Sequence, residues 1–570
     1  MAITLEDLIR IARGEDEADL VLKNARVVNV FSGDIHVTNI AIASTRIAGL
    51  GDYRGKVEID LDGAYVCPGF IDGHVHIESS MLRVPEFARA VLPHGTTSVV
   101  IDPHEIANVL GFDGIRYMLE SSKRNPLSVY VMVPSCVPAT EMETSGARIL
   151  PSDLALLLKE NWVQGVGEMM NYPGVLFREP SVMAKVRAGA GKRIDGHAPS
   201  LSGRDLMAYI AAGVGSDHEC TRLEEAKEKL RMGMYIMIRE GSTARNLRDL
   251  LPLVTPATAR RCMFVTDDRH PLELLEEGHL DSIIRAAIAS GLDPITAIQM
   301  ATLNPAEYFG LPDRGGIKPG WRADLVVFDN FMDFRILKVL RGGQIVAERG
   351  RFVGSLSPHN PAIVRSSMNV HPPSISFAIP AHGNRIRVIG LIPGQIVTQQ
   401  LTMEPKTDGG FVVADTERDL LKIAVVERHQ ATGNVGLGFV HGFGLKRGAL
   451  ASSVAHDSHN IILVGTNDAD MRVALERMVE MRGGLVAVQG GEVQAQLPLP
   501  IAGLMSDRPL EEVGGAFREL LRAAADMGSA LGDPFTALSF LALPVIPSLK
   551  LTDQGLVDVT QFRFVPLFVQ

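Results

Sequence analysis

Eight short apolar runs between residues 64 and 315 constrain the fold of this chain more than any other feature. Segments with apolar residues at helical spacing separate the runs, for example 223–230. Short runs that are apolar throughout suit strands buried on both faces of a parallel sheet. Eight such strands alternating with helices over about 250 residues have the size of a closed parallel barrel, so we predict a (β/α)8 TIM-like barrel. The runs are 64–67, 97–101, 128–133, 163–167, 192–195, 213–215, 234–238 and 262–265.

Alternating apolar and polar residues flank this segment on both sides. They occupy 20–60 and begin again near 323, where the tetrapeptide Ala-Asp-Leu-Val of 18–21 recurs. Such alternation is typical of short antiparallel strands. We expect the two segments to pair into one flanking β-sandwich; two unrelated β-arms are the alternative. The predicted α/β chain then divides into an N-terminal sandwich segment (1–63), the barrel (64–315), a second sandwich segment (316–360) and a C-terminal α+β domain (361–570).

Composition limits the function classes. A length of 570 residues suggests two to four domains, and a net charge of -10 without any basic block argues against a nucleic-acid partner. The four cysteines include no CxxC pair and are expected to be free thiols in a reducing compartment. Residues 1–10 do not resemble a signal peptide, and no long uncharged apolar run predicts a membrane span. We therefore expect a cytoplasmic protein, and we further expect a homodimer or higher homo-oligomer.

Nearly every apolar run is followed by residues able to bind a metal or to titrate. His74 and His76 stand two positions apart, so on an extended strand their imidazoles share one face. The carboxyl ends of parallel barrel strands meet at one mouth, which would bring all these residues together. In chain order they are His74 and His76; Asp102, His104 and Glu105; Ser135 and Cys136; Glu168; His197; Asp217, His218 and Glu219; Arg239 and Glu240; and Asp267 and Asp268.

This set contains enough ligands for two divalent metal ions. Imidazole and carboxylate ligands suit Mn, Fe(II) or Zn without selecting one of them. The expected ligands are His74, His76 and Asp267 for one ion, His197 and His218 for the other, and Glu168 as the bridge. Two such ions would make water ionise near neutral pH. A one-metal site that leaves Glu168 as a general acid is the alternative.

Several segments carry a resemblance to known enzymes. Residues 68–76, with ligand-type strand ends at Glu168, His197, His218 and Asp267, resemble the amidohydrolase superfamily. Further segments are similar to the adenine deaminases of that superfamily: 102–109, 167–171, 215–219, 266–269 and 456–460. The resemblance covers essentially the whole chain. It implies a metal-dependent barrel with a flanking β-sandwich, a small purine as substrate, and hydrolysis of adenine to hypoxanthine and ammonia in purine salvage (EC 3.5.4.2).

The resemblance also bears on the catalytic roles. Many deaminases of this superfamily have a His-x-x-x-Glu after the fifth strand, but 197–201 contains no Glu, so another residue must protonate the purine. We expect Glu105 or Asp102 to do this, and Asp267 to take the proton of the attacking water. An ion pair with His104 or a loop cap is the structural alternative for Glu105 and Asp102. Glu219 would orient His218. Expected substrate contacts are His104, Arg239, Glu240, Ser242 and Asp268, with a structural role as the alternative for Arg239, Glu240 and Ser242.

The loop 456–460 offers two more histidines, His456 and His459. A loop that reaches the active-site mouth is favoured over a third metal site. Competing functions remain open. One is an amidohydrolase acting on a cyclic amide or N-acyl substrate, although Gly167-Glu168 offers no bridging lysine. A non-catalytic purine- or metal-binding protein is the more distant one. The zinc deaminases that require a Pro-Cys-x-x-Cys motif are excluded, because the chain has no CxxC.

Overall fold

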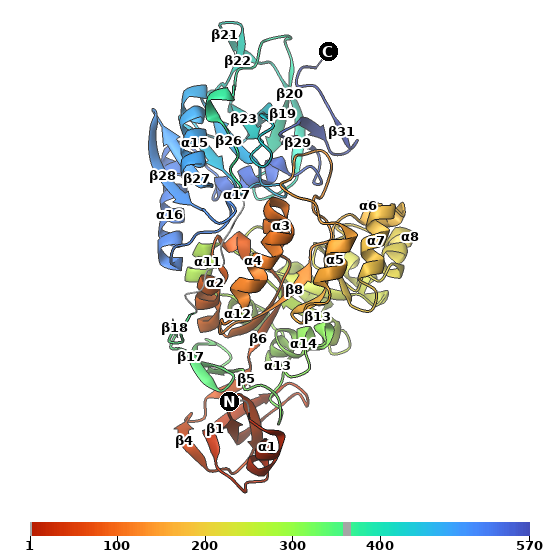
Figure 1. The fold of residues 1–570 in the computed structure, drawn as a ribbon, viewed down its shortest axis with the longest axis vertical. Coiled ribbons are helices and arrows are strands. Elements are labelled where there is room, and N and C mark those ends of the chain that lie inside the picture. Colours follow the sequence, from red (N-terminus) through yellow and green to blue (C-terminus); the bar gives the residue numbers. More distant parts are fainter. Residues whose placement is uncertain (1–2, 357–365, 570) are drawn as a thin grey trace.

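A curled sheet of parallel strands forms the middle of the molecule in the computed structural model, which describes residues 3–356 and 366–569 (Figure 1). Its strands are β6 (Phe70–His76), β7 (Thr96–Ile101), β8 (Ser128–Val133), β9 (Val163–Met169), β10 (Arg193–Gly196), β11 (Ser216–Asp217), β12 (Tyr235–Arg239), β13 (Cys262–Val265) and β14 (Asp267–Asp268). They form two arcs, β10-β9-β8-β7-β6-β14 and β11-β12-β13. The amide of Gly215 donates to the carbonyl of Ile194 at 2.9 Å and links the arcs next to β10. Together the arcs make a partial barrel.

Alternate residues of these strands supply two cores. Val100 points into the curled sheet, where it packs with Ile71 and Met237, whereas its neighbour Val99 packs outward against the helices. This alternation is the period of two of an extended strand, and both faces are apolar because both are covered. The helices that follow the strands are α2 (Val84–Val91), α3 (His104–Leu110), α4 (Phe112–Ser122), α5 (Pro151–Leu157), α6 (Tyr172–Leu176), α7 (Pro180–Ala188), α8 (Gly203–Ala211), α9 (Leu223–Arg231), α10 (Leu247–Leu250), α11 (Pro271–Glu276), α12 (Leu280–Ala289), α13 (Pro294–Met300) and α14 (Leu303–Phe309).

A nine-stranded mixed sheet lies at the N-terminal end of the molecule, below the curled sheet in Figure 1. Its strands are β1 (Ala18–Asn29), β2 (Asp34–Ala43), β3 (Arg46–Leu50), β4 (Gly55–Asp60), β5 (Tyr65–Pro68), β15 (Leu325–Phe328), β16 (Ile336–Arg341), β17 (Gln344–Glu348) and β18 (Arg351–Phe352), and helix α1 (Leu5–Ala12) precedes them. Strand β5 pairs parallel with β1 and antiparallel with β15. Segments from both sides of the curled sheet therefore share one hydrogen-bonded sheet.

The prediction that run 64–67 is the first barrel strand is wrong. That run is β5 of the mixed sheet, and the curled sheet begins with β6. The chain changes sheets after Pro68, the last residue of β5, which still pairs with Leu325 of β15. The Gly69 amide donates to the carbonyl of Asp324 at 2.8 Å, and a Cβ at Gly69 would lie 2.3 Å from Oγ1 of Thr97. Apolar content alone cannot distinguish two buried strands in different sheets.

The C-terminal part is a second mixed assembly at the other end. An eight-stranded sheet has the order β20-β19-β24-β23-β26-β25-β27-β28. Strands β21 and β22 pair with each other, and β29, β30 and β31 form a further sheet. The strands of the whole C-terminal part are β19 (Ile386–Leu391), β20 (Thr398–Met403), β21 (Lys406–Asp408), β22 (Phe411–Val413), β23 (Leu420–Val426), β24 (Val435–His441), β25 (Ala449–Ser452), β26 (Ile461–Gly465), β27 (Gly484–Gln489), β28 (Glu492–Pro498), β29 (Leu549–Thr552), β30 (Gly555–Asp558) and β31 (Arg563–Phe564). The helices are α15 (Asp468–Glu480), α16 (Leu510–Asp526) and α17 (Pro534–Ser539).

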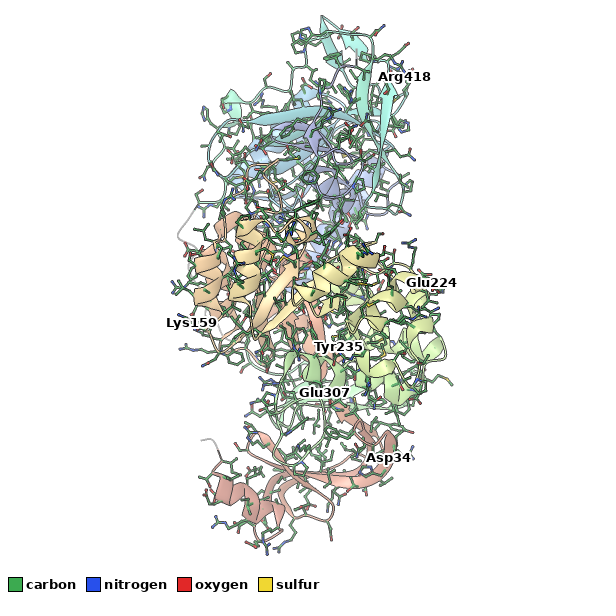
Figure 2. The ribbon with its side chains drawn as sticks, turned by 90° about the vertical axis from the view of Figure 1, so that its right-hand side faces the viewer. Asp34, Lys159, Glu224, Tyr235, Glu307 and Arg418 are labelled. Atoms are coloured by element: carbon green, nitrogen blue, oxygen red, sulfur yellow. The ribbon has the colours of Figure 1, made fainter. Side chains whose placement is uncertain are left out.

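This C-terminal part contacts the curled sheet directly. The amide of Ser506 donates to the carbonyl of Met81 at 2.8 Å, and Arg89 on α2 binds Glu511 on α16 with 2.7 Å between Nη1 and Oε1. Figure 1 shows α3 lying against this part, and Figure 2 places Arg418 and Asp34 at opposite ends of the long axis. The C-terminal part therefore covers the end of the curled sheet from which α3 projects.

Two simpler expectations concern the whole chain. All four cysteines are buried and free, as their spacing predicts. Within 3–356 and 366–569, no helix combines the length and the apolar content that crossing a bilayer requires.

Candidate metal centre and active site

The six residues predicted to bind metal meet at the carboxyl ends of the parallel strands. Strand β6 carries two of them, β9 and β14 carry one each, and the remaining two directly follow β10 and β11. Five of the six are buried, and the side chain of His197 is 24% exposed. Ligand atoms of several triplets lie within 4.8 Å of one another. The triplets are His74, His76 and Glu168; His74, His218 and Asp267; and Glu168, His197 and His218.

One half of the cluster joins the two histidines of β6 to two carboxylates. Nε2 of His76 lies 3.1 Å from Oε1 of Glu168 and 3.2 Å from Oδ1 of Asp267. Nε2 of His74 lies 3.6 Å from the same two oxygens. Ligands of a tetrahedral ion with bonds of about 2.0–2.1 Å are separated by roughly 3.3 Å. The observed separations therefore suit ligands arranged around a shared cation better than direct hydrogen bonds.

The other half joins the second oxygen of Glu168 to two further imidazoles. Oε2 of Glu168 lies 2.8 Å from Nδ1 of His197 and 3.3 Å from Nε2 of His218. Burial alone would raise the pKa of Glu168, but the adjacent imidazoles, His218 above all, lower it well below its usual range. Each oxygen of one ionised carboxylate thus faces a different pair of imidazoles. This is the arrangement that a bridging ligand needs.

Two details of the histidines fit metal ligands. Nε2 of His74 is buried and makes no hydrogen bond, although it points between two carboxylates. Nδ1 of His76 lies 2.8 Å from the carbonyl of Asp102, so Nδ1 carries a proton and Nε2 is the ring nitrogen that faces the carboxylates. A metal-binding histidine commonly donates its other N–H to a carbonyl in this way. The buried cluster of histidines, glutamate and aspartate is consistent with metal binding.

Asp102 supports the cluster from behind. Its Oδ2 accepts the backbone amide of Glu168 at 2.7 Å. A Cβ at Gly167 would lie 2.0 Å from that oxygen, so only glycine allows the carboxylate to approach β9 this closely. Its Oδ1 is 3.7 Å from Nδ1 of His104, whose ring also lies 3.4 Å from Glu168. The structure places Asp102 beneath the backbone of Glu168.

A buried lysine on α9 orders the two loops that carry His197 and His218. Nζ of Lys229 donates to Asp217, Glu225 and the carbonyl of Ala198 at 3.0, 2.9 and 2.7 Å. Asp217 in turn accepts the amide of Ala198 at 2.9 Å. Because Lys229 is fully buried, these contacts compensate its charge. The network fixes the residues next to both histidines.

Arg239 links the cluster to Glu219. Its Nη1 donates to Oδ2 of Asp267 at 2.7 Å and also to Glu219. Glu219 lies 3.7 Å from Nδ1 of His197 and 3.5 Å from Nε2 of His218. Arg239 therefore directs the second oxygen of Asp267 away from β6, which leaves Oδ1 facing the histidines.

The other predicted substrate contacts differ in their hydrogen-bond partners and surroundings. Asp268 accepts a hydrogen bond from Ser79 and lines a cavity between the curled sheet and the C-terminal part. Glu240 accepts the amide of Leu247 at 3.0 Å. Ser242 donates to Glu273 at 2.7 Å, at the start of α11. The structure thus gives Glu240 a partner seven residues further along the chain and Ser242 a partner on α11, whereas Asp268 faces a cavity.

Glu105 is the point where the C-terminal part reaches the cluster. Its Oε1 lies 2.8 Å from Nδ1 of His456, and its Oε2 contacts Nε2 of His459. Nε2 of His104 lies 3.3 Å from Oε1 of the same carboxylate. These contacts confirm that the loop 456–460 reaches the mouth of the curled sheet. The ring of His456 stacks on Phe540 with centroids 4.7 Å apart, and both rings line the cavity next to Asp268.

Sequence reasoning assigned no role to two supporting residues. Asp72 accepts the amides of His74 and Thr266 at 3.2 and 3.3 Å and so ties β6 to the chain entering β14. The only sequence feature that could indicate a role for Asp72 is its position two residues before His74. Lys229 lies in the helical segment 223–230, for which the sequence alone indicates no function. Helical spacing places it on the same face as the buried Ala226, and this position was the available signal.

Comparison with known proteins agrees with the geometry. Residues 65–346 match the amidohydrolase family, and residues 395–563 match the adenine deaminase C-terminal domain. An adenine deaminase of Desulfatibacillum aliphaticivorans is 53% identical over 99% of each chain, and one of Dehalococcoides mccartyi is 52% identical over 99% of this chain and all of the relative. A crystal structure of an adenine deaminase matches 58% of this chain and 99% of its own length at 20% identity, with a TM-score of 0.46. By its full-length identity to these relatives, the chain belongs to the adenine deaminases of the amidohydrolase family.

Proposed function

We propose that this chain hydrolyses adenine to hypoxanthine and ammonia at the cluster around Glu168. The observation that supports this proposal most directly is that Glu168 presents one oxygen to His74 and His76 and the other to His197 and His218. Full-length identity to adenine deaminases supports the choice of substrate. We further propose that the parallel strands act as one (β/α)8 barrel in which β13 and β14 count as a single eighth strand, flanked by a sandwich segment on each side and by a C-terminal domain from about residue 361.

We propose that the cluster holds two divalent ions, Mn, Fe(II) or Zn. His74, His76 and Asp267 would bind one of them, His197 and His218 the other, and Glu168 both. When bound, such ions supply a Lewis acid that makes water ionise near neutral pH. The donor set supports this assignment, because it consists of imidazoles and carboxylates only.

Asp267 is the residue that takes the second proton of the attacking water. It is buried, and Arg239 holds its Oδ2 at 2.7 Å while Oδ1 faces the histidines of β6. Burial alone would raise the pKa of Asp267, but Arg239 and the adjacent histidines lower it well below its usual range. The carboxylate is therefore ionised and able to accept a proton from the attacking water.

Glu105 carries a proton to the purine ring. Attack of water oxygen on C6 forms a C–O bond and leaves a negative charge that N1 must take up as N–H. Glu105 first accepts the proton that leaves the water and then delivers it to N1. Asp267 takes the remaining hydroxyl proton and passes it to the amino group, the C6–N bond breaks, and ammonia leaves as C6 becomes the carbonyl of hypoxanthine. Water supplies both protons, so the reaction is balanced.

Purified, metal-analysed protein is expected to release ammonia and hypoxanthine from adenine, and to lose this activity on chelation and recover it when metal returns. The same preparation should leave cyclic amides and N-acyl amino acids unchanged, because Gly167-Glu168 provides no lysine to form the carboxylated bridge of that enzyme class. Spectrophotometric adenine loss and an ammonia assay check this. Hydrolysis of an amide with no adenine turnover would replace the proposal by an amidohydrolase. Binding of adenine without turnover would leave a purine-binding protein.

A further inference from the structure

Two histidines of the C-terminal part contact the carboxylate of Glu105 at the barrel mouth. Glu105 and the further of the two, His459, are 354 positions apart in the sequence. His456 approaches Oε1 of Glu105 through Nδ1, and His459 approaches Oε2 through Nε2. All three side chains are buried or nearly so; the most exposed, His456, is 12% exposed. Each oxygen of Glu105 therefore has its own imidazole partner.

The protonation of His459 follows from its second nitrogen. The backbone amide of Ala455 donates to Nδ1 of His459 at 3.1 Å. A ring nitrogen that accepts a hydrogen bond carries no proton, so the proton of the neutral ring is on Nε2. Nε2 is therefore a donor directed at Glu105. Burial lowers the pKa of His459 to about 4, which agrees with a neutral ring.

The same detail separates this group from the metal ligands. Nδ1 of His76 donates to a carbonyl, which leaves Nε2 as the nitrogen that can face a metal, as in metal-binding histidines. His459 has the opposite pattern, because Nδ1 receives an amide hydrogen and Nε2 is protonated. A protonated nitrogen cannot bind a cation. Glu105, His456 and His459 could hold a metal by their spacing alone, but the hydrogen bonds of His459 assign them to a proton-donating arrangement.

The loop that carries both rings is fixed from the C-terminal side. Arg428 is fully buried and donates to the carbonyls of His459, Ser367 and Ala502, the last two at 2.6 and 3.0 Å. Stacking against Phe540 orients the ring of His456. His459 itself has a φ of 55°, a left-handed conformation that non-glycine residues adopt mainly where the surroundings enforce it. The rings are thus held in place independently of Glu105.

We infer that His456 and His459 are positioning residues, through which the C-terminal part orients Glu105 as the proton carrier of the reaction. This inference depends on the proposed function. Without the two donors, Glu105 would be free to turn toward His104, which lies 3.3 Å from Oε1. The C-terminal part then belongs to the catalytic apparatus, and does not serve only as an appended domain.

Paired substitutions test the inference. His459→Gln keeps an N–H donor where Nε2 stands, and His456→Asn keeps one where Nδ1 stands, whereas His459→Met and His456→Leu remove them. We expect the donor-removing variants to lose on the order of 100-fold in kcat, and the donor-retaining variants to lose no more than about tenfold. KM for adenine, metal content and Tm should change little. His371→Asn, at an exposed histidine of the C-terminal part, is the matched control.

Several results would overturn the inference. Unchanged kcat in His459→Met would do so, and so would a kcat loss that is equal in the Met and Gln variants. A metal content above two per chain that falls in either variant would identify a third metal site instead. Wild-type protein is assayed alongside. A wild-type protein that does not deaminate adenine contradicts the proposed function, whereas an active wild-type protein with equally active variants contradicts this inference alone. A readout independent of activity is long-range ¹H–¹⁵N spectra of zinc-loaded, histidine-labelled protein. These should show His459 as the Nε2–H tautomer, and an Nδ1–H tautomer would contradict it.

Discussion

Replacing Glu168 with glutamine is expected to lower the metal content below two ions per chain and to reduce adenine turnover more than about 100-fold. This loss exceeds the one expected from removing a residue that only hydrogen-bonds to a metal ligand. Glutamine has nearly the same shape, so the change removes charge and one oxygen ligand but little volume. Its NH2 group would face one pair of imidazoles as a donor and could not bind a cation. One pair of histidines would then lose its shared carboxylate ligand.

Metal analysis after gel filtration measures the first effect, and ammonia release measures the second. Glu160→Gln is a suitable control, because Glu160 is exposed just before β9 and this substitution removes the same charge as Glu168→Gln. This control should keep both metals and full turnover. Normal metal content together with normal turnover in Glu168→Gln would refute the bridging role.

Glu105→Gln is expected to retain both metals and to lose on the order of 10²- to 10⁴-fold in kcat, the usual contribution of a positioned general acid or base. Glu105 contacts His104, His456 and His459, and no metal ligand is among these. The glutamine side chain keeps one acceptor oxygen for one imidazole but cannot accept a proton and deliver it to N1. Substrate affinity should change much less than kcat.

Steady-state kinetics with metal analysis of the same sample checks this result. Glu120→Gln on α4 provides a control for the charge change at a partly exposed glutamate. Loss of metal in Glu105→Gln would show that the carboxylate supports the metal centre, and unchanged turnover would return it to a purely structural role.

Much of the metal centre was predictable from the sequence because parallel strands impose a common geometry. A ligand-type residue directly after an apolar run must lie at the mouth shared by all strands, so six residues between His74 and Asp267 could be placed together without coordinates. His-x-His added a local rule, since alternate strand residues share a face. These rules depend only on strand direction and on a period of two, both of which are visible in the chain.

The remaining features depend on contacts that have no sequence period. Run 64–67 is as apolar as a barrel strand, and only its pairing with β1 and β15 places it in another sheet. Asp102 has the position of a mouth residue, yet its carboxylate turns beneath Glu168 because Gly167 leaves space for it. The approach of His459 to Glu105 is a contact between regions far apart in the chain. No local pattern encodes which side of a second domain will face the mouth.

Titration of the metal-free protein with Mn²⁺, following adenine deamination at each step, tests most directly whether a pair of ions shared by Glu168 activates the water. Activity should rise until two equivalents per chain are bound and should then remain constant. A plateau at one equivalent, or full turnover in protein that contains no metal, would contradict the shared centre.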